Sequence, residues 1–311
     1  MNITIISPLD IAHQCSLMWQ GLNEYTKHKC RYILLKESYL GYAADMLYEK
    51  VEPYEIIDVL ANTDFFLFTT QLTNFPFYEL SGKLHRRNHL VMTYGSEVRM
   101  NSANYLISWL RNDLMIVTSH DYTQSSPVGF SAQHIPISID FREVPERQPH
   151  GDDVIRVFHS PTAPKLKNTD LFLQSMEALT KKFKRKKAEF TVETVLVEGK
   201  PWKVCMEEKS RCDIVYDQFA IGSYGMGTVE SWAMSLPVLG RANYWLRSFH
   251  PDLPILDVNA DSLKQRLEHL ITEANVREEA GRQGRLFCEQ NHDLSVNIRK
   301  LEYLIRHVME R

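Results

Sequence analysis

Short runs of apolar residues alternate with amphipathic stretches along the first half of the chain. A β-branched run from Ile3 to Ile6 is followed by a turn signal and then by a helical pattern, which we expect to begin near Asp10, a good N-cap residue. The same alternation continues downstream. It predicts strands at 31–35, 65–68, 89–93 and 114–118 and helices at 53–61, 77–86 and 101–111. Strands and helices that alternate at this spacing are typical of a parallel sheet with helices on both faces.

The apolar pattern is lost between Phe141 and Asp153, where two prolines and a glycine appear, and we place a domain boundary there. The pattern then restarts. It predicts strands at 154–158, 189–197, 214–216 and 238–239 and helices at 169–183, 204–211, 228–235, 262–275, 276–291 and 294–309. We therefore expect an α/β protein with Rossmann-like domains at 1–145 and 150–293, followed by a helix at 294–311.

Composition narrows the class of protein. A chain of 311 residues with 44% hydrophobic residues has room for two cores, and its formal net charge of −3 provides no overall field that attracts a polyanion. Five scattered cysteines without a C-x-x-C pair, a start without a basic leader and the lack of a long apolar run lead us to expect a cytoplasmic protein. Peripheral contact with a membrane stays open. The basic run at 181–187 is interpreted as a solvated helix end, with anionic lipid or nucleic acid as the alternative.

The stretch 212–240 carries the strongest chemical signal. A predicted strand ends near Asp217, a loop with glycines at 222, 225 and 227 follows, and we expect a helix to open at Thr228 as its N-cap. Glycines let a backbone approach a ligand closely, and the amides and dipole of a helix start suit a diphosphate. Glu230, in the first turn, is placed to accept hydrogen bonds from a ribose diol. The alternative is a tight turn in which Glu230 only complements the helix dipole.

A second stretch, 157–170, runs from a predicted strand through a loop with Lys165 and Lys167 into a helix. Because this loop and the glycine loop follow strands of one sheet, we expect both ammonium groups to lie over the same sheet edge. A lysine there supplies positive charge where a leaving diphosphate develops negative charge. The alternative is that both lysines are ordinary surface residues.

Both stretches resemble the C-terminal domain of GT-B fold, retaining glycosyltransferases of family 4. Residues 159–162 (His-Ser-Pro-Thr) with 167–170 (Lys-Asn-Thr-Asp) resemble the family's H-x-P-[ST]…K-G-T-[DE] loop, with Asn168 in place of the usual glycine. Residues 224–238 are similar to its G…E-[AS]-x-A-x-G-x-P-V segment. In the N-terminal half, 93–99 is similar to the H-G-S-[DE]-x-R element of related enzymes.

The resemblance implies two Rossmann-like domains that face a cleft, with the donor on the C-terminal domain and the acceptor on the N-terminal one. It also implies that the helix at 294–311 packs back on the N-terminal domain. It implies that Glu230 binds the ribose hydroxyls of a UDP- or GDP-linked sugar and that Lys167, with Lys165, neutralises the diphosphate. We expect Glu230 and Lys167 on solvent-facing loop or helix ends. The remaining donor-binding candidates are Asp217, Tyr224, Gly225, Met226, Gly227, Thr228 and Val229.

The resemblance also has departures. Many members carry a glutamate eight residues before the ribose-binding one, and this chain has Gly222 there, so Asp217 or Gln218 is the candidate for the contact to the donor sugar. The usual Gly-Gly loop after the first strand is replaced by residues 7–13. The chain has no D-x-D motif, and its histidines show no metal-binding spacing, so we expect neither a metal nor a resident cofactor.

The acceptor side is defined less sharply. Its candidates are Asp10, His13, Ser96, Glu97 and Arg99, with helix capping by Asp10 or His13 and an ion pair of Glu97 with Arg99 as alternatives. The favoured acceptor is a glycan or a lipid-linked saccharide, and a modified base in nucleic acid is less favoured. A GT-B shaped binding protein without transfer activity and a nucleotide-sugar epimerase are the competing functions, and the oligomeric state is left open.

Overall fold

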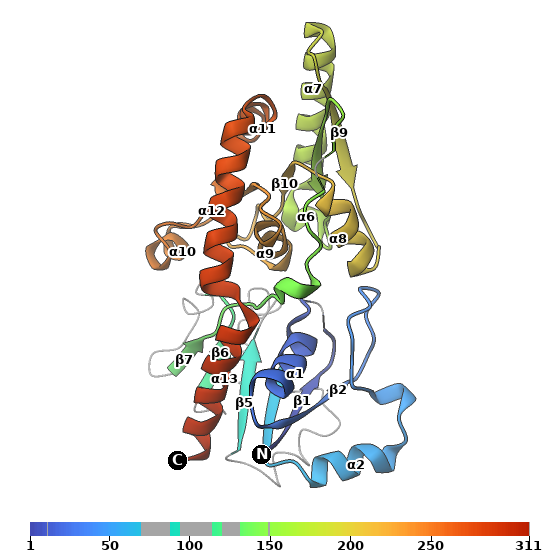
Figure 1. The fold of residues 1–311 in the computed structure, drawn as a ribbon, viewed down its shortest axis with the longest axis vertical. Helices are drawn as coiled ribbons and strands as arrows, with labels where there is room; N and C mark the ends of the chain where they lie inside the picture. Colours follow the sequence, from blue (N-terminus) through green and yellow to red (C-terminus); the bar gives the residue numbers. More distant parts are fainter. Residues whose placement is uncertain (11, 70–87, 94–113, 120–130, 149, 311) are drawn as a thin grey trace. The chain divides into compact units, whose positions relative to one another are not determined.

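The computed structural model describes residues 1–10, 12–69, 88–93, 114–119, 131–148 and 150–310. The chain divides into two compact units, which we describe separately. Unit 1 comprises Met1–Ser138 and Asp293–Arg311, and unit 2 comprises Ile139–His292. The change of unit after Ser138 lies just before the segment 141–153, where the apolar periodicity is lost. Each unit is built on its own parallel sheet with helices on its faces (Figure 1).

Unit 1 contains a seven-stranded sheet. Its elements are β1 (Asn2–Ser7), α1 (Gln14–Tyr25), β2 (Lys29–Leu34), β3 (Met46–Leu47), η1 (Tyr48–Lys50), α2 (Pro53–Ala61), β4 (Phe65–Thr69), β5 (His89–Thr93), β6 (Leu114–Val117), β7 (Ser131–His134) and α13 (Leu294–Met309). The strand order is β3-β2-β1-β4-β5-β6-β7, and every neighbouring pair is parallel. The order runs outward from β1 in both directions, so the sheet has the doubly wound arrangement that the sequence predicted.

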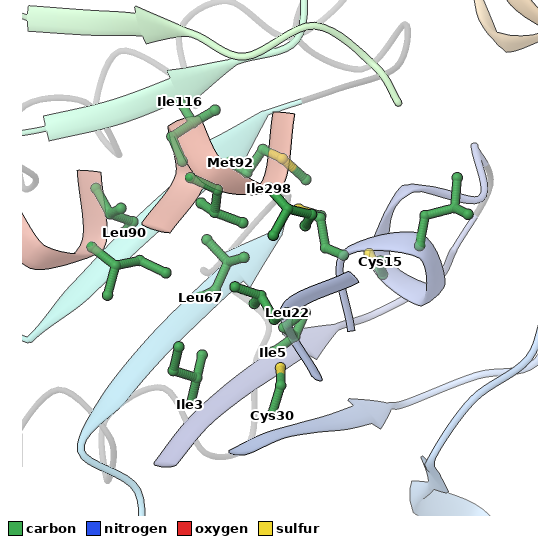
Figure 2. Packing of buried hydrophobic residues seen from close by; sticks show 14 of the residues in the cluster. Ile3, Ile5, Cys15, Leu22, Cys30, Leu67, Leu90, Met92, Ile116 and Ile298 are labelled. Carbon is green, nitrogen blue, oxygen red and sulfur yellow. The ribbon is translucent and has the colours of Figure 1, made fainter. Parts of the chain in front are cut away.

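Successive side chains of a strand point to opposite sides of the sheet. Both faces of this sheet are buried, because each packs in its own apolar cluster. Ile5, Leu67 and Leu90 lie on the face that packs against α1 and α13, and Figure 2 shows them converging with Ile298 of α13. On the opposite face, Phe66 packs in a second cluster that includes residues of α2. Strands buried on both sides require continuous apolar runs, which explains why they were recognisable in the sequence.

Helix α13 belongs to unit 1 although it follows unit 2 in the sequence. It packs against α1, where Gly21 leaves room for the close approach: a Cβ atom at this position would lie 2.6 Å from Cγ1 of Ile298. Leu294, Ile298 and Leu301 are buried in the same cluster as the β1 side chains. An essential part of the unit 1 core is therefore supplied from beyond residue 292.

Most predicted elements are present, and several have the predicted ends. Helix α2 and strand β5 have the predicted bounds, whereas β3 and β7 were not predicted. The prediction that α1 begins near Asp10 is wrong, because His13 has a φ of 61° and the helix begins only at Gln14. Asp10 still caps it from outside, since its Oδ2 accepts the Ser16 N–H at 3.1 Å. The helices predicted at 77–86 and 101–111 lie outside the described residues.

Unit 2 contains a five-stranded parallel sheet. Its elements are η4 (Phe141–Glu143), β8 (Val154–His159), α6 (Pro164–Lys167), α7 (Thr169–Lys186), β9 (Thr191–Leu196), α8 (Trp202–Ser210), β10 (Ile214–Tyr216), α9 (Met226–Ala233), β11 (Val238–Gly240), α10 (Tyr244–Phe249), β12 (Leu256–Asp257), α11 (Leu263–Thr272) and α12 (Ala274–His292). The strand order is β12-β11-β10-β8-β9. Short elements without a full apolar period, α6, α10 and β12, were not predicted.

Helices cover both faces of this sheet too. Val157 and Tyr216 pack with residues of α7 and α11 on one side. On the other side, α9 contacts β11 and α12. Helix α12 comes very close, because a Cβ atom at Gly281 would lie 2.0 Å from the carbonyl oxygen of Ser235. Among the described residues, none of the helices is both long and apolar enough to cross a membrane.

Candidate functional site

Polar and charged side chains gather at the carboxyl ends of β8 and β10 in unit 2. His159 is the last residue of β8, and Asp217 directly follows β10. The loop after Asp217 is fastened on both sides, since the Ala220 amide donates to the Leu166 carbonyl at 2.9 Å and the Arg241 amide donates to the Gln218 carbonyl at 2.8 Å. This loop leads into α9, so the helix start lies at the sheet edge where open α/β sheets bind ligands.

Lys167 is held at this edge by two acceptors. Its Nζ donates to Oδ1 of Asp217 at 2.5 Å and to the carbonyl oxygen of Ser160 at 3.0 Å. The second carboxylate oxygen of Asp217 accepts the hydroxyl of Thr228 at 2.6 Å. Side-chain exposure is 12% for Lys167 and 5% for Asp217. Side chains from α6, from the residue after β10 and from the first turn of α9 therefore meet in one buried polar cluster.

The electrostatics of Asp217 follow from this cluster. Burial alone would raise its pKa, but the ammonium group of Lys167, the hydroxyl of Thr228 and the more distant charge of Lys209 outweigh burial and hold the pKa below its ordinary value. Asp217 is therefore a carboxylate at neutral pH. Its charge fixes Lys167 beside the first turn of α9.

Helix α9 begins two residues earlier than expected. Gly225 occupies the N-cap position, so the prediction that Thr228 is the N-cap is wrong: its hydroxyl is committed to Asp217. The amides of Thr228 and Val229 donate to the Gly225 carbonyl at 3.1 and 3.2 Å. A Cβ atom at Gly227 would lie 3.4 Å from both oxygens of Asp217, an ordinary contact distance, so the carboxylate lies directly against the first turn of the helix.

Glu230 lies one turn further along α9, and the expectation that it faces solvent is wrong. Its Oε2 lies 2.5 Å from Nζ of Lys209, and its Oε1 accepts the indole N–H of Trp202 at 2.7 Å. The carboxylate is buried, and α8 supplies both of its partners. Lys167 is likewise only partly accessible.

Two supporting residues explain features of the 159–170 motif. His159 is fully buried, its Nδ1 lies 3.0 Å from the Tyr216 carbonyl and its Nε2 lies 2.8 Å from the Thr169 hydroxyl. Burial lowers the pKa of His159 to about 4, so the ring is neutral and braces the loop. Asn168 has φ 52° and ψ 48°, a left-handed conformation that asparagine tolerates better than most residues, which accounts for it in place of glycine.

The other donor-side candidates occupy different environments. Lys165 is exposed on α6, near the site but outside the buried cluster. Tyr224 packs its ring 5.1 Å from that of Trp232 and its hydroxyl lies 3.3 Å from Nε2 of His292. Met226 is half-buried in the first turn of α9, and Val229 is fully buried.

Gly222 adopts a backbone conformation that disfavours a side chain. Its φ is 69°, and a Cβ atom would lie 3.0 Å from Cβ of Asn243, whose amide donates to the Gly222 carbonyl at 2.7 Å. The loop geometry therefore accounts for glycine where many proteins of the resembled family carry glutamate.

The acceptor-side candidates belong to unit 1. Asp10 is buried; burial raises its pKa to about 6, and the amides of Ser16 and its neighbours at the start of α1 offset only part of this. His13 stacks on Tyr42 with ring centroids 4.4 Å apart. Ser96, Glu97 and Arg99 lie outside the described residues.

Sequence reasoning missed Trp202 and Lys209. Both lie on α8, but the predicted helix began at 204 and so left out the tryptophan. A signal was present: the two residues are seven apart, which places them on one helix face two turns from each other. A lysine and a tryptophan on the face that packs inward indicate a buried acceptor opposite them.

Comparison with solved structures identifies the fold class. Unit 1 and unit 2 together have the GT-B fold of two Rossmann-like units, as the sequence predicted, and this prediction is confirmed. No protein-family model and no curated protein matches the sequence.

Three of the similar structures span nearly the whole chain. Sucrose-phosphate synthase from Thermosynechococcus elongatus is 11% identical with a TM-score of 0.68, covering 100% of this chain and 99% of that one. HepE from Anabaena, in complex with UDP-glucose, is 11% identical with a TM-score of 0.66, covering 98% and 99%. WaaG, a glycosyltransferase involved in lipopolysaccharide biosynthesis, is 11% identical with a TM-score of 0.58, covering 98% and 99%.

Proposed function

We propose that unit 2 binds a nucleotide-diphosphate sugar and that the chain is a glycosyltransferase. The observation that carries the proposal is the position of Lys167, fixed by Asp217 beside the first turn of α9. A lysine has three N–H donors, and Lys167 uses two of them on Asp217 and Ser160, so one donor is left for a phosphate oxygen within the described part of the site.

The start of α9 and the exposed Lys165 favour an anionic ligand. Lys167 and Lys209 balance Asp217 and Glu230, so these four groups together carry no net charge. The attraction for a diphosphate then comes from the start of α9, whose amides and dipole favour negative charge, and from the exposed Lys165. As the bond to the sugar breaks, the same groups stabilise the charge that develops on the leaving diphosphate.

Glu230 is the proposed partner of the ribose. A carboxylate offers about four lone-pair sites, and Lys209 and Trp202 engage one site on each oxygen. The other lone pairs are suited to accept hydrogen bonds from a ribose diol. Exclusion of water by α8 strengthens such bonds, because they form in a medium of low dielectric constant.

The reaction proposed is transfer with retention of configuration to a saccharide or lipid-linked acceptor that unit 1 binds. It needs no resident metal, since lysine and helix amides supply the positive charge. A uridine nucleotide is favoured over a guanosine one, because similar structures contain UDP-glucose in HepE and UDP in MnaA from S. aureus. The HepE and MnaA structures are 11% and 10% identical to this chain.

A second candidate is a GT-B shaped binding protein without transfer activity. It is favoured by Gly222, which offers no side chain to the donor sugar, and by the two protein donors that already engage Glu230. Donor binding is common to both candidates, and turnover separates them.

The test is a thermal-shift screen of the full chain against UDP, GDP, ADP, CMP and dTDP and their common sugars, with and without EDTA. A ligand at 100 times its Kd stabilises the folded state by about 2.7 kcal/mol, which is an easily measured rise in melting temperature. We expect one nucleotide to stabilise the wild type regardless of EDTA, Lys167→Met to lose the shift, and the exposed control Lys184→Met to keep it. A wild type that no nucleotide stabilises contradicts the proposal.

Turnover is then measured as nucleotide release with and without a saccharide acceptor, and the anomeric configuration of the product is read by proton NMR. Release that depends on the acceptor identifies a transferase. Donor binding without any release favours the binding protein.

A further inference from the structure

Two side chains of helix α8 contact the carboxylate of Glu230, one at each oxygen. Trp202 donates its indole N–H to Oε1 at 2.7 Å, and Nζ of Lys209 lies 2.5 Å from Oε2. The two donors are seven residues apart and so lie on one face of the helix. Each oxygen of Glu230 therefore has its own fixed partner.

The ion pair of Lys209 and Glu230 is buried, so removing its charges from water costs free energy. Side-chain exposure is 2% for Lys209 and 6% for Glu230, and the ammonium group also lies 3.4 Å from the Gly227 carbonyl and 5.5 Å from the ring centroid of Phe158. Burial would lower the pKa of Lys209, but the adjacent carboxylate of Glu230, with a smaller contribution from Asp217, outweighs burial and raises the pKa above its ordinary value. Lys209 is therefore a cation in the folded protein.

A buried ion pair of this kind is a poor way to gain stability, because desolvation offsets much of the attraction, and apolar residues of similar volume often serve as well or better. What the pair provides is orientation. A carboxylate with one donor fixed on each oxygen cannot rotate about its last torsion without breaking both bonds. Its unused lone pairs then point in fixed directions.

We propose that Lys209 and Trp202 are positioning residues that aim the carboxylate of Glu230 at the two hydroxyls of the nucleotide ribose. This rests on the proposed function, which assigns the ribose to Glu230. It goes further by making recognition of a ribonucleotide depend on two residues of α8 that do not touch the ligand.

The experiment combines a change in the protein with a change in the ligand. The Kd values of UDP and GDP are measured by calorimetry beside those of their 2′,3′-dideoxy counterparts, which lack the diol. The proteins are the full-length wild type, Glu230→Gln, Lys209→Met, Trp202→Phe and the control Lys203→Met, which alters an exposed lysine of the same helix.

For the wild type we expect the nucleotide with the diol to bind at least about tenfold more tightly than the one without it, since hydrogen bonds to a charged group are the strong ones. Glu230→Gln and Lys209→Met should reduce this ratio to within about twofold of one, and Trp202→Phe should reduce it partly. Lys203→Met should keep it. A merely structural role of Lys209 would weaken both ligands alike and leave the ratio unchanged.

An independent readout needs no ligand. In protein labelled with ¹⁵N at tryptophan, the indole resonance of Trp202, assigned by its loss in Trp202→Phe, reports the hydrogen bond to Glu230. We expect Lys209→Met to move this resonance and Lys203→Met to leave it in place.

The outcomes separate the two proposals. If the wild type binds neither nucleotide, or binds both forms equally, the ribose assignment falls and the positioning role with it. If Glu230→Gln loses the preference for the diol but Lys209→Met and Trp202→Phe keep it, the positioning role is wrong and the proposed function stands. Should Lys209→Met fail to fold, as judged by circular dichroism, Trp202→Phe decides: an unchanged preference overturns the inference.

Discussion

The pair of Lys167 and Asp217 ties stability to the proposed site, and Lys167→Met tests this link. The substitution keeps much of the side-chain length but removes the ammonium group, so Oδ1 of Asp217 loses its partner at 2.5 Å and Oδ2 keeps the hydroxyl of Thr228 at 2.6 Å. Breaking a buried ion pair by removing one partner costs about 3–5 kcal/mol. We take the lower end, about 3 kcal/mol, because Thr228 remains and Lys167 is 12% exposed. At about 2–4 °C per kcal/mol, the melting temperature should fall by roughly 6–12 °C.

The double variant Lys167→Met/Asp217→Asn distinguishes a stranded charge from a packing defect. If the loss comes from the uncompensated carboxylate, removing that charge as well should recover most of the stability. If the loss comes from packing, the two substitutions should add. Lys184→Met, which alters an exposed lysine of α7, is the matched control and should change the melting temperature little.

The dependence of stability on pH tests whether the loss in Lys167→Met comes from the charge of Asp217. In the wild type the pKa of Asp217 lies below its ordinary value of 3.8, so the stability that this carboxylate contributes is present above pH 3.8 and is lost as the pH falls through the lower, folded-state pKa. In Lys167→Met the buried carboxylate has no adjacent cation, and its pKa should rise instead. The deficit of the variant should then shrink as the pH is lowered from 8 to 5. Melting followed by circular dichroism at these pH values measures it. A loss below about 1 kcal/mol, or a deficit that does not change with pH, would refute the reasoning.

Two further predictions concern buried groups of unit 2. Because burial lowers the pKa of His159 to about 4 from 6.5, the unfolded chain takes up this proton first on acidification, so the stability that His159 contributes should fall by about 2 kcal/mol between pH 8 and 5. Denaturant titrations should show a change in His159→Gln that lacks this contribution, and equal changes in the wild type and the variant would contradict the assignment. Gly281→Ala should destabilise by about 1–3 kcal/mol despite the better helix propensity of alanine, because its Cβ would lie 2.0 Å from the Ser235 carbonyl oxygen. Gly151→Ala, where nothing lies within 4 Å, is the control, and a melting temperature raised by Gly281→Ala would show that α12 is not held by this contact.

The sequence was most informative where the chain is continuously apolar. Strands such as β4 and β5 are buried on both faces, so their composition alone identifies them. Helix α2 was found with its correct ends, because Pro53 at its first position fixes the start. Two-residue strands such as β3 contain too few positions to show any period, and only their neighbours in the sheet define them.

The candidate site was predictable in composition but not in its contacts. The residue types at 167, 217 and 230 identified the chemistry, whereas the partners of each depend on which segments the fold brings together. Thr228 shows the difference. Local rules assign it to helix capping, but its hydroxyl donates instead to the buried carboxylate of Asp217, eleven residues earlier in the sequence. Lys209 was missed because a lysine in a helix is nearly always exposed, and its seven-residue spacing from Trp202 was the available signal.

The place of α13 in unit 1 has a consequence for how the chain is made. A ribosome synthesises the elements of unit 1 from β1 to β7, and then all of unit 2, before it reaches Leu294. Unit 2 is continuous in sequence and has all its parts once residue 292 has emerged. The side of the first sheet that receives Ile298, Leu301 and Ile305 has to wait for the helix that covers it. During synthesis, unit 1 is therefore begun before unit 2 and completed after it, and the apolar surface that α13 covers stays exposed until then.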